Sequence, residues 1–333
     1  MLSIILVHYK SNELLMNCLQ SIFQFDTARF EIIVVDNDSK DNVEELLTKS
    51  YPSVRFVQMG YNAGFARANN AGIRQSTGEV LLLLNTDTLL KEDAINACLN
   101  DFIHTEAAAC GVQLLNEDGT PQIAGNYAMK GGLNYLLPLP YWGNFLKKIA
   151  EVLKVSKPHV PNVSTVAEVD WINGAFLMVR QSAIEKAGLL DEDFFLYAEE
   201  AEWCSRLKKS GKLLILGKHH VYHLQGKTAN MAFESTGQGY YNLYDQKGLQ
   251  IMVSNFLRIR KEFGIGWMLF SELNYLLVIP IFLIGVLLSK IWPLQSTNRY
   301  AFKDWVGYCD NVAKLISLTP RILLNRPHFY KFL

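Results

Sequence analysis

One carboxylate, Asp87, follows an uninterrupted apolar run at residues 80–84, within the polar cluster Asn85-Thr86-Asp87-Thr88. Five apolar residues without polar alternation predict a strand buried on both faces, which places Asp87 at the carboxyl end of a central strand. Ligands of open α/β sheets bind beyond these strand ends, so we expect a metal ion or a phosphate near Asp87. A turn, or a cap for a helix at residues 91–103, explains the same cluster equally well.

A second polar cluster, Asp36-Asn37-Asp38-Ser39, follows a buried strand predicted at residues 31–35 and precedes a helix at about residues 41–49. An acidic side chain at this place can accept a hydrogen bond from a ribose hydroxyl or a base N–H. An Asx-turn and helix cap would account for Asp38 or Ser39 well, and for Asp36 less well.

A loop with two glycines and an asparagine, at residues 59–64, joins a strand predicted at 54–58 to a helix at about 65–75. Such a loop can turn backbone amides and a helix N-terminus toward an anion. Asn and Gly are also ordinary turn formers, so the loop alone is a weak signal.

Three acidic residues, Glu199, Glu200 and Glu202, lie early in a helix predicted to run to about Ser210. Their mutual repulsion is partly offset by the helix dipole, as expected for a solvated helix start. However, they directly follow aromatic residues at 194–197 that are expected to be buried. We therefore expect at least one carboxylate to point into a cleft, where it could act as a general base at neutral pH.

Three histidines, His219, His220 and His223, lie near two short strands predicted at residues 213–216 and 221–224. A lone histidine is more often a hydrogen-bonded structural residue than a ligand. A carboxylate from a distant strand together with a neutral imidazole would form half of a shell for Mg²⁺ or Mn²⁺. The sequence does not show that Asp87 and His223 meet.

Strands and helices alternate from residue 2 to residue 103, which predicts a mostly parallel central sheet with helices on both faces. A further strand is expected at residues 169–180. The turn after the first strand, Tyr9-Lys10-Ser11, contains no glycine. A dinucleotide-binding Rossmann unit needs a Gly-x-Gly-x-x-Gly turn there, so a nicotinamide-dependent dehydrogenase loses most of its support.

The chain has 333 residues, 50% of them hydrophobic, and a formal net charge of +0. It can bury a large core, and it has no global field to attract nucleic acid. Five cysteines without a Cys-x-x-Cys pair indicate reduced thiols in a cytosolic compartment. Residues 1–7 lack a basic leader and a cleavage site, so no secretion signal is predicted.

Periodicity fades across residues 121–166, which we interpret either as a lid that closes over the site or as a surface insertion. Residues 267–292 are strongly apolar, with an uncharged core at 273–289 that contains Pro280. This length is at the lower limit for a membrane span. The sequence fits a helix lying in or against a bilayer and a buried helical hairpin equally well, and it fits a true membrane span less well.

Together the motifs resemble the family 2 glycosyltransferases, and within them the bacterial rhamnosyltransferase-like enzymes of surface polysaccharide synthesis. The resemblance covers residues 2–228. It is carried by the order and spacing of Val34-Val35-Asp36-Asn37-x-Ser39, Asn62-x-Gly64-Phe65-x-x-x-Asn69-Asn70, Leu84-Asn85-Thr86-Asp87, Asn173-Gly174-Ala175, Leu190-Asp191-x-x-Phe194-Phe195-Leu196-Tyr197-x-Glu199-Glu200-x-Glu202 and His223-x-x-Gly226.

The resemblance implies the GT-A fold, a divalent metal (Mg²⁺ or Mn²⁺) and inversion at the anomeric carbon. The implied donor is a dTDP- or UDP-sugar, with L-rhamnose as the leading sugar, and the implied acceptor is a saccharide or a lipid-linked saccharide. The catalytic domain would be residues 1–235, with a nucleotide-binding half 1–115 and an acceptor half 116–235. Residues 236–333 would form a helical region, placing the enzyme in the cytoplasm, peripheral on the inner face of the membrane.

Carried over residue by residue, the family's roles assign Glu200 as the base, Asp87 and His223 to the metal, and Asp36 to the nucleotide base. The donor pocket would include Asn62, Gly64, Asn69, Asn70 and Thr86, and the sugar and acceptor would be bordered by Trp171, Asn173, Asp191 and Glu199.

The sequence departs from the family pattern at two positions. The usual acidic pair is Glu-Asp or Asp-Asp, whereas here it is Glu199-Glu200, whose longer second side chain moves the carboxylate. The first acidic position of the metal motif is Asn85, which leaves Asp87 as its only charged ligand. A sugar-nucleotide-binding protein without catalysis is therefore the alternative function.

Overall fold

The computed structural model describes residues 1–155, 159–160, 162–224, 233, 235, 242–291 and 300–332. The chain forms two compact units. The first comprises residues 1–128, 159–195 and 199–228, and the second comprises residues 129–158, 196–198 and 229–333. Gly226, the last residue of the sequence motifs, lies outside the described residues.

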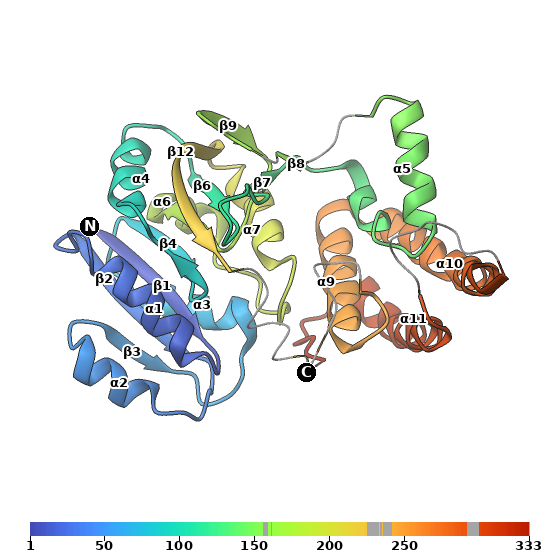
Figure 1. Cartoon of the computed structure of the whole chain (residues 1–333), viewed down its shortest axis with the longest axis horizontal. Coiled ribbons are helices and arrows are strands. Elements are labelled where there is room, and N and C mark those ends of the chain that lie inside the picture. The colour runs from blue at the N-terminus through green and yellow to red at the C-terminus, as the bar shows by residue number, and fades with distance from the viewer. Residues whose placement is uncertain are drawn as a thin grey trace. The chain divides into compact units, whose positions relative to one another are not determined.

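The first unit is built on a mixed sheet of nine strands among the described residues (Figure 1). Its main order is β3-β2-β1-β4-β11-β6-β12-β5, and β9 pairs with β12. The strands are β1 (Leu2–His8), β2 (Phe30–Asp36), β3 (Arg55–Gln58), β4 (Val80–Asn85), β5 (Thr88–Leu89), β6 (Ala109–Leu115), β9 (Val166–Val169), β11 (Phe176–Arg180) and β12 (Leu213–His223).

The N-terminal half of this sheet is parallel, as the alternation of strands and helices predicts. β1 pairs in parallel with both β2 and β4, and β2 pairs in parallel with β3. β11 then runs antiparallel to β4 and β6, so the sheet is mixed beyond β4. Because β1, β2 and β4 share one direction, the ends of these strands at His8, Asp36 and Asn85 lie along the same edge.

Helices α1 (Asn12–Ile22), α2 (Val43–Ser50), α3 (Gly64–Gln75), α4 (Ala94–Ile103), α6 (Gln181–Ala187) and α7 (Glu199–Leu207) complete the first unit. α3 packs directly on β1 and β2. At Gly72 a Cβ would collide with the Ile5 side chain, so glycine allows this close approach. The core is the apolar strand interior, which includes Ile4, Leu82 and Leu177 at 0% exposure.

Two strand predictions need correction. The strand expected at residues 169–180 is two strands, β10 (Trp171–Ile172) and β11, because Asn173 leaves the sheet. Its backbone N–H donates to the Ala124 carbonyl, and its side chain accepts from the Ala175 N–H. β10 instead joins a small sheet with β7 (Gly125–Asn126) and β8 (His159–Val160). The two strands expected at 213–216 and 221–224 are one strand, β12, with a register shift between Leu216 and His220.

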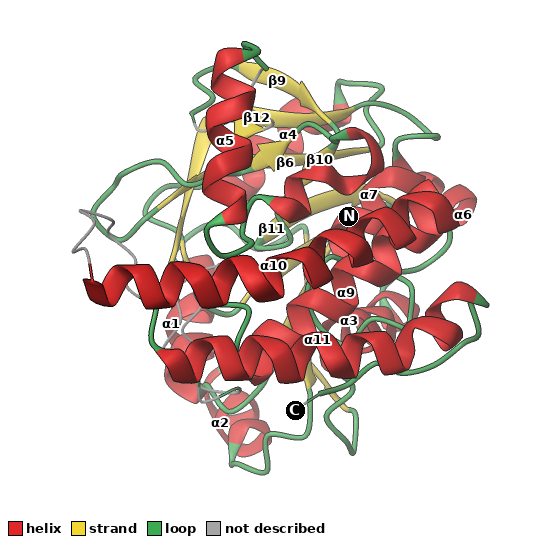
Figure 2. Ribbon diagram, turned by 90° about the vertical axis from the view of Figure 1, so that its right-hand side faces the viewer, coloured by secondary structure: helices red, strands yellow, loops and turns green. Residues whose placement is uncertain are grey.

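The second unit is helical: η1 (Lys130–Leu136), α5 (Trp142–Val152), α9 (Gln246–Phe263), α10 (Ile265–Ile291) and α11 (Phe302–Leu323). α10 and α11 lie side by side, and α9 packs on both (Figure 2). Residues 129–155 belong with these helices rather than with the predicted acceptor half, because Trp142 donates to Asn274 and Arg258 donates to the Tyr135 hydroxyl. Closure of residues 121–166 over the site stays a prediction.

Candidate active site

The sheet brings Asp87 and His223 together, which the sequence alone did not show. Thr86 and Asp87 form the turn between β4 and β5, and His223 is the last residue of β12, paired with Thr88. His223 Nε2 lies 3.3 Å from Asp87 Oδ1, and the Leu224 N–H donates to the Asp87 carbonyl oxygen at 2.9 Å. Both side chains are buried, so their contact occurs largely out of water.

Gln122 fixes the orientation and tautomer of His223. Gln122 Nε2 donates to the backbone carbonyl oxygen of His223 at 2.6 Å and to Asn116 Oδ1 at 2.8 Å. Its Oε1 therefore faces His223 Nδ1, at 3.0 Å, and Nδ1 must carry the proton. Gln122 was missed by the sequence analysis, because it lies where periodicity fades and no motif includes it.

In neutral His223 this tautomer leaves the Nε2 lone pair facing a carboxylate oxygen. Two acceptors 3.3 Å apart are favourable only with a proton or a cation between them. A carboxylate and an imidazole whose other nitrogen is held by a second side chain are also a standard donor arrangement for a divalent metal. Among the described residues no group of three or more His, Cys, Asp or Glu side chains forms a larger metal cluster.

Asp36 lies at the carboxyl end of β2, in register with His8 of β1 and Gln58 of β3. Both of its carboxylate oxygens accept the Ser39 N–H, at 3.2 Å each, which is the Asx-type turn anticipated for this cluster. Asp36 is buried at 3% exposure. Each oxygen keeps further acceptor capacity for a ligand N–H or O–H.

Asn62 and Gly64 belong to a loop held by side-chain amides. Asn37 Nδ2 donates to Asn62 Oδ1 at 3.0 Å, and the Ala63 N–H donates to Asn37 Oδ1 at 2.7 Å. Gly64, at φ 73°, begins α3, and a Cβ there would collide with the carbonyl oxygen of Phe195. The adjacent Phe65 N–H donates to that same oxygen at 2.8 Å. Glycine is therefore required at position 64 for two reasons: its φ is positive, and any side chain there would collide with Phe195.

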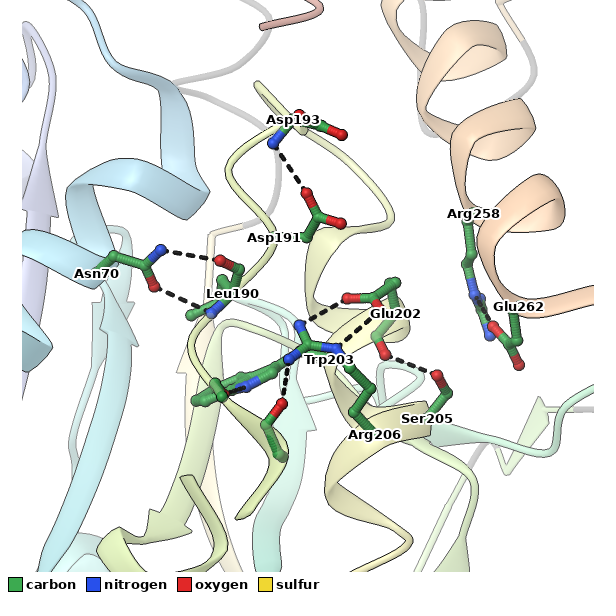
Figure 3. Close-up of polar contacts among 12 residues, drawn as sticks. Asn70, Leu190, Asp191, Asp193, Glu202, Trp203, Ser205, Arg206, Arg258 and Glu262 are labelled. Carbon is green, nitrogen blue, oxygen red and sulfur yellow. Dashed lines mark hydrogen bonds and ion pairs between the residues drawn. The ribbon is translucent and has the colours of Figure 1, made fainter. Parts of the chain in front are cut away.

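Asn70 anchors the segment that carries Asp191. Its Nδ2 donates to the Leu190 carbonyl oxygen at 2.9 Å, and its Oδ1 accepts the Leu190 N–H at 3.0 Å (Figure 3). Asn69 Nδ2 donates to the Phe65 carbonyl oxygen at 2.9 Å. Asn69 and Asn70 are 1% and 0% exposed, so both amides make their hydrogen bonds inside the protein, and their predicted place in the donor pocket stays a prediction. The Asp191 side chain accepts the Asp193 N–H at 2.9 Å (Figure 3).

The three acids that begin α7 have different environments. Glu202 forms a two-point ion pair with Arg206, through Nε–Oε1 and Nη2–Oε2 contacts of 2.8 Å each (Figure 3). Glu199 is buried, and its Oε2 has no hydrogen-bond partner among the described residues. Burial, and secondly the charge of Glu200, raise the pKa of the Glu199 carboxyl well above its ordinary value. Burial therefore favours the neutral, protonated form of Glu199.

Glu200 lies against the Asn173-Gly174-Ala175 turn. A Cβ built at Gly174 would lie 3.5 Å from Glu200 Cγ, which is an ordinary van der Waals distance and places Glu200 beside this turn. The carbonyl oxygen of the next residue, Ala175, accepts the Asn85 N–H at 3.1 Å. The turn therefore lies next to Glu200 and is bonded to the end of β4, two residues before Asp87.

Trp171 lies in the small sheet rather than in the main one, paired with Asn126. Among the described residues, its indole Nε1 has no hydrogen-bond partner. Asn173, which follows β10, is held by the Ala124 and Ala175 backbone as described above. Their predicted roles beside the sugar and acceptor stay predictions.

His8 is a second buried residue that the sequence analysis missed. It ends β1 beside Asp36, is 0% exposed, and its Nε2 lies 3.1 Å from Asp41 Oδ2. The only signal in the sequence is its place directly after an apolar strand, the same signal that identified Asp36 and Asp87.

Part of the chain resembles a known family. The sequence model described as "Glycosyl transferase family 2" matches residues 3–161, a little less than half of the chain. The matched part contains β1 to β6 with Asp36, Asp87 and Gln122, while Glu200 and His223 lie beyond it.

Three curated relatives of the chain are named as sugar transferases. It is 29% identical over 213 residues to the low-salt glycan biosynthesis hexosyltransferase Agl10 of Haloferax volcanii, covering 62% of each chain. It is 26% identical to the N-acetylglucosaminyl-diphospho-decaprenol L-rhamnosyltransferase of Mycobacterium tuberculosis, covering 68% of this chain and 78% of the relative. It is 24% identical to the rhamnosyltransferase WbbL of Escherichia coli, covering 67% and 83%.

Two solved structures share the fold. One is GalNAc-T7 with UDP, GalNAc and Mn²⁺, with a TM-score of 0.51, 14% identity, and coverage of 67% of this chain and 42% of that one. The other is the mannosyltransferase PcManGT from Pyrobaculum calidifontis with GDP-Man and Mn²⁺, with a TM-score of 0.50, 14% identity, and coverage of 98% and 87%. The predicted GT-A fold is therefore confirmed.

Proposed function

We propose that this chain is a glycosyltransferase, which moves a sugar from a nucleoside diphosphate to an acceptor hydroxyl by a single inverting displacement assisted by a divalent metal. The observation that carries the proposal is the buried Asp87–His223 pair beyond the end of β4, with Glu200 near the Asn173-Gly174-Ala175 turn, whose Ala175 carbonyl oxygen accepts the Asn85 N–H. An inverting displacement needs one base and one centre that stabilises the leaving diphosphate, and no covalent nucleophile.

The metal would be held by Asp87 Oδ1 and His223 Nε2, whose donor atoms already face each other. When bound, Mg²⁺ or Mn²⁺ would neutralise the charge that develops on the departing diphosphate. Gln122 Oε1 accepts a hydrogen bond from the Nδ1–H of neutral His223, and this keeps the Nε2 lone pair directed at the site. Two protein ligands suit a metal that takes its remaining ligands from water and phosphate oxygens.

Glu200 is the proposed base. Burial favours the neutral form of Glu199 in the acidic pair, and we assign the role of base to Glu200. An ionised carboxylate at Glu200 would remove the acceptor hydroxyl proton as that oxygen attacks the anomeric carbon. Glu200 lies near Gly174, in the turn whose Ala175 carbonyl oxygen bonds the end of β4.

The donor would lie over the carboxyl ends of β1, β2 and β4. There Asp36 can accept a base N–H, and the loop with Asn62 and Gly64 would shape the pocket together with Thr86, Asn69 and Asn70. Two relatives are named rhamnosyltransferases, and one of these names gives a diphospho-decaprenol acceptor. We therefore propose L-rhamnose carried by dTDP, or another UDP- or dTDP-sugar, as donor. The proposed acceptor is a saccharide or lipid-linked saccharide of cell-surface polysaccharide synthesis, met at the cytoplasmic face of the membrane.

The test is titration calorimetry of the full chain against dTDP, UDP, GDP and their sugars, first with Mn²⁺ and then with EDTA. We expect one nucleotide to bind in a metal-dependent manner. Asp87→Asn should remove the metal dependence. Asp101→Asn is the matched control, because Asp101 also contacts a histidine, His219, at 2.9 Å but on the exposed surface. A folded protein that binds none of these nucleotides would overturn the proposal.

A further inference from the structure

Helix α10 in the second unit is apolar on both sides: it buries Tyr275, Val278 and Phe282, and it also buries its polar residues while exposing leucines. Its polar residues Ser271, Glu272 and Asn274 are 2%, 8% and 8% exposed. Leucines of the same turns point outward, and Leu273 is 64% exposed. An ordinary surface helix buries its apolar stripe and exposes its polar face, so α10 is built for non-aqueous surroundings on its outer side.

The inward polar residues are satisfied within the second unit. Glu272 Oε1 accepts the Thr319 hydroxyl at 2.6 Å, and Asn274 Oδ1 accepts the Trp142 indole N–H at 3.1 Å. These bonds fix the rotation of α10 about its axis. Its outward face is a continuous apolar stripe spaced at helical intervals: Leu269, Phe270, Leu273, Leu277, Ile284 and Leu288.

Helix α10 passes the length and composition test for a membrane span, with 33% of its most apolar window buried. Its neighbour argues against a span. α11 lies alongside it, bonded through Trp305 Nε1 to the Ile279 carbonyl oxygen at 3.0 Å. α11 exposes Asp310 and Lys314 in its middle, and a spanning α10 would carry these charges into hydrocarbon. Helix α10 therefore packs against α11, as in the predicted helical hairpin, and also has an exposed apolar face. Both features fit a helix that lies along a membrane surface and does not cross the membrane.

Helix α5 adds a second apolar face of the same kind. It exposes Phe145 and Ile149, and the residues at its end, Val152 and Leu153, are 81% and 68% exposed. Exposed lysines, Lys148 and Lys154, accompany them. Apolar residues with lysines at the margin are typical of a helix that lies in a membrane interface. An open apolar hollow of about 470 Å³, lined by Leu133, Gly266, Trp267 and Phe270, lies at the N-terminal end of α10.

The charge of this unit identifies the kind of surface it meets. Basic residues outnumber acidic ones by 14 to 6 over residues 129–155, 242–291 and 300–332. The whole chain has 32 of each, so the remainder has 18 basic and 26 acidic residues. An apolar stripe on a unit of net positive charge complements a bilayer with anionic headgroups. A second copy of the same basic surface would instead meet it with like charge.

We propose that the outward faces of α10 and α5 insert into the headgroup region of an anionic bilayer, with α10 parallel to the membrane plane. This inference deepens the proposed function, because a transferase held at a membrane surface would reach lipid-linked acceptors. The inference depends on the proposed function only for the biological purpose of membrane binding, because the apolar surface itself belongs to the second unit.

The test is co-flotation of the full chain with vesicles of three parts phosphatidylcholine to one part phosphatidylglycerol. The variant is Leu273→Glu with Leu277→Glu, two exposed positions on the α10 stripe. The matched control is Ile103→Glu with Val166→Glu, exposed apolar residues of the first unit. We expect the stripe variant to bind vesicles at least about tenfold more weakly, because burying one leucine is worth more than a factor of ten in partitioning. The control should bind like the unaltered chain.

Binding should weaken on pure phosphatidylcholine and at high salt, since part of it is electrostatic. A chain that does not float, or a stripe variant that floats like the control, would overturn the inference. So would a dimer in sedimentation velocity that the stripe substitutions dissociate, because a second copy would then cover the face. Nucleotide binding by calorimetry is measured on the same variants. If a protein still binds nucleotide but fails to bind vesicles, this inference fails while the proposed function stands.

Discussion

The acidic pair that begins α7 allows a comparison of two substitutions of identical size, Glu199→Gln and Glu200→Gln. Each replaces a carboxyl group by an amide of nearly the same shape. Glu199 is buried with a raised pKa, and a protonated carboxyl and an amide are both neutral. Glu199→Gln should therefore keep kcat within a few-fold of the unaltered enzyme. Glu200→Gln removes the proposed base and should lower kcat by about 10²- to 10⁴-fold with donor affinity kept.

The same raised pKa makes a prediction about stability. In the unfolded chain Glu199 loses its proton near its ordinary pKa of 4.5, whereas the folded protein retains it to higher pH. The unfolded state then binds fewer protons, so the carboxyl lowers the free energy of unfolding as pH rises above 4.5, by about 1.4 kcal/mol per pH unit until the folded pKa is reached. Below that window both states are protonated and the group has no effect.

Glu199→Gln removes this penalty, so the variant should unfold at a higher temperature than the unaltered protein at pH 7 and at a similar temperature at pH 4. Thermal unfolding across this range, with kcat from donor turnover with acceptor, measures both quantities. Glu202→Gln is the contrasting variant, since it breaks the ion pair with Arg206 and should destabilise the protein. Two outcomes would refute the reasoning: a Glu199→Gln variant as inactive as Glu200→Gln, or one that gains no stability at neutral pH.

Three further predictions follow from single contacts. Gln122→Leu should weaken Mn²⁺ binding by about 10- to 100-fold in a metal titration, because His223 loses the partner that fixes its tautomer; an unchanged affinity would contradict this. Asn70→Ala should lower the free energy of unfolding in urea by about 2 kcal/mol or more, since the Leu190 backbone loses both bonds; a loss below about 0.5 kcal/mol would contradict it. Gly64→Ala should destabilise more than Gly60→Ala in the same assay, because both have φ near 74° but only Gly64 meets Phe195; equal losses would remove the steric argument.

The sequence was most informative where the chain leaves a buried strand. Apolar runs without alternation identified β1, β2 and β4, and the polar residues after two of them, Asp36 and Asp87, lie on one edge as parallel strands require. His8 follows the third strand in the same way, but a histidine after a strand has no pattern that separates it from a core residue.

Contacts between distant segments could not be predicted from local patterns. Gln122 meets His223 across a sequence separation of 101 residues, and Asn70 meets Leu190 across 120. No periodicity records such pairs. The grouping of residues 129–155 with the C-terminal helices depends on contacts of the same kind, made by Trp142 and Tyr135. By contrast, the Glu202–Arg206 pair follows from i,i+4 spacing alone.

The late position of β12 in the chain has a consequence for how the protein is made. Asp36, Asn62 and Asp87 leave the ribosome early, and β1 to β4 pair with one another through connections of moderate length. His223 arrives only with β12, whose docking beside β6 and β5 must close a much longer loop. A nascent or truncated chain that ends before β12 would keep its proposed nucleotide-side residues and lack His223, the second proposed metal donor. The pairing of Asp87 with His223 therefore forms only after β12 has joined the sheet.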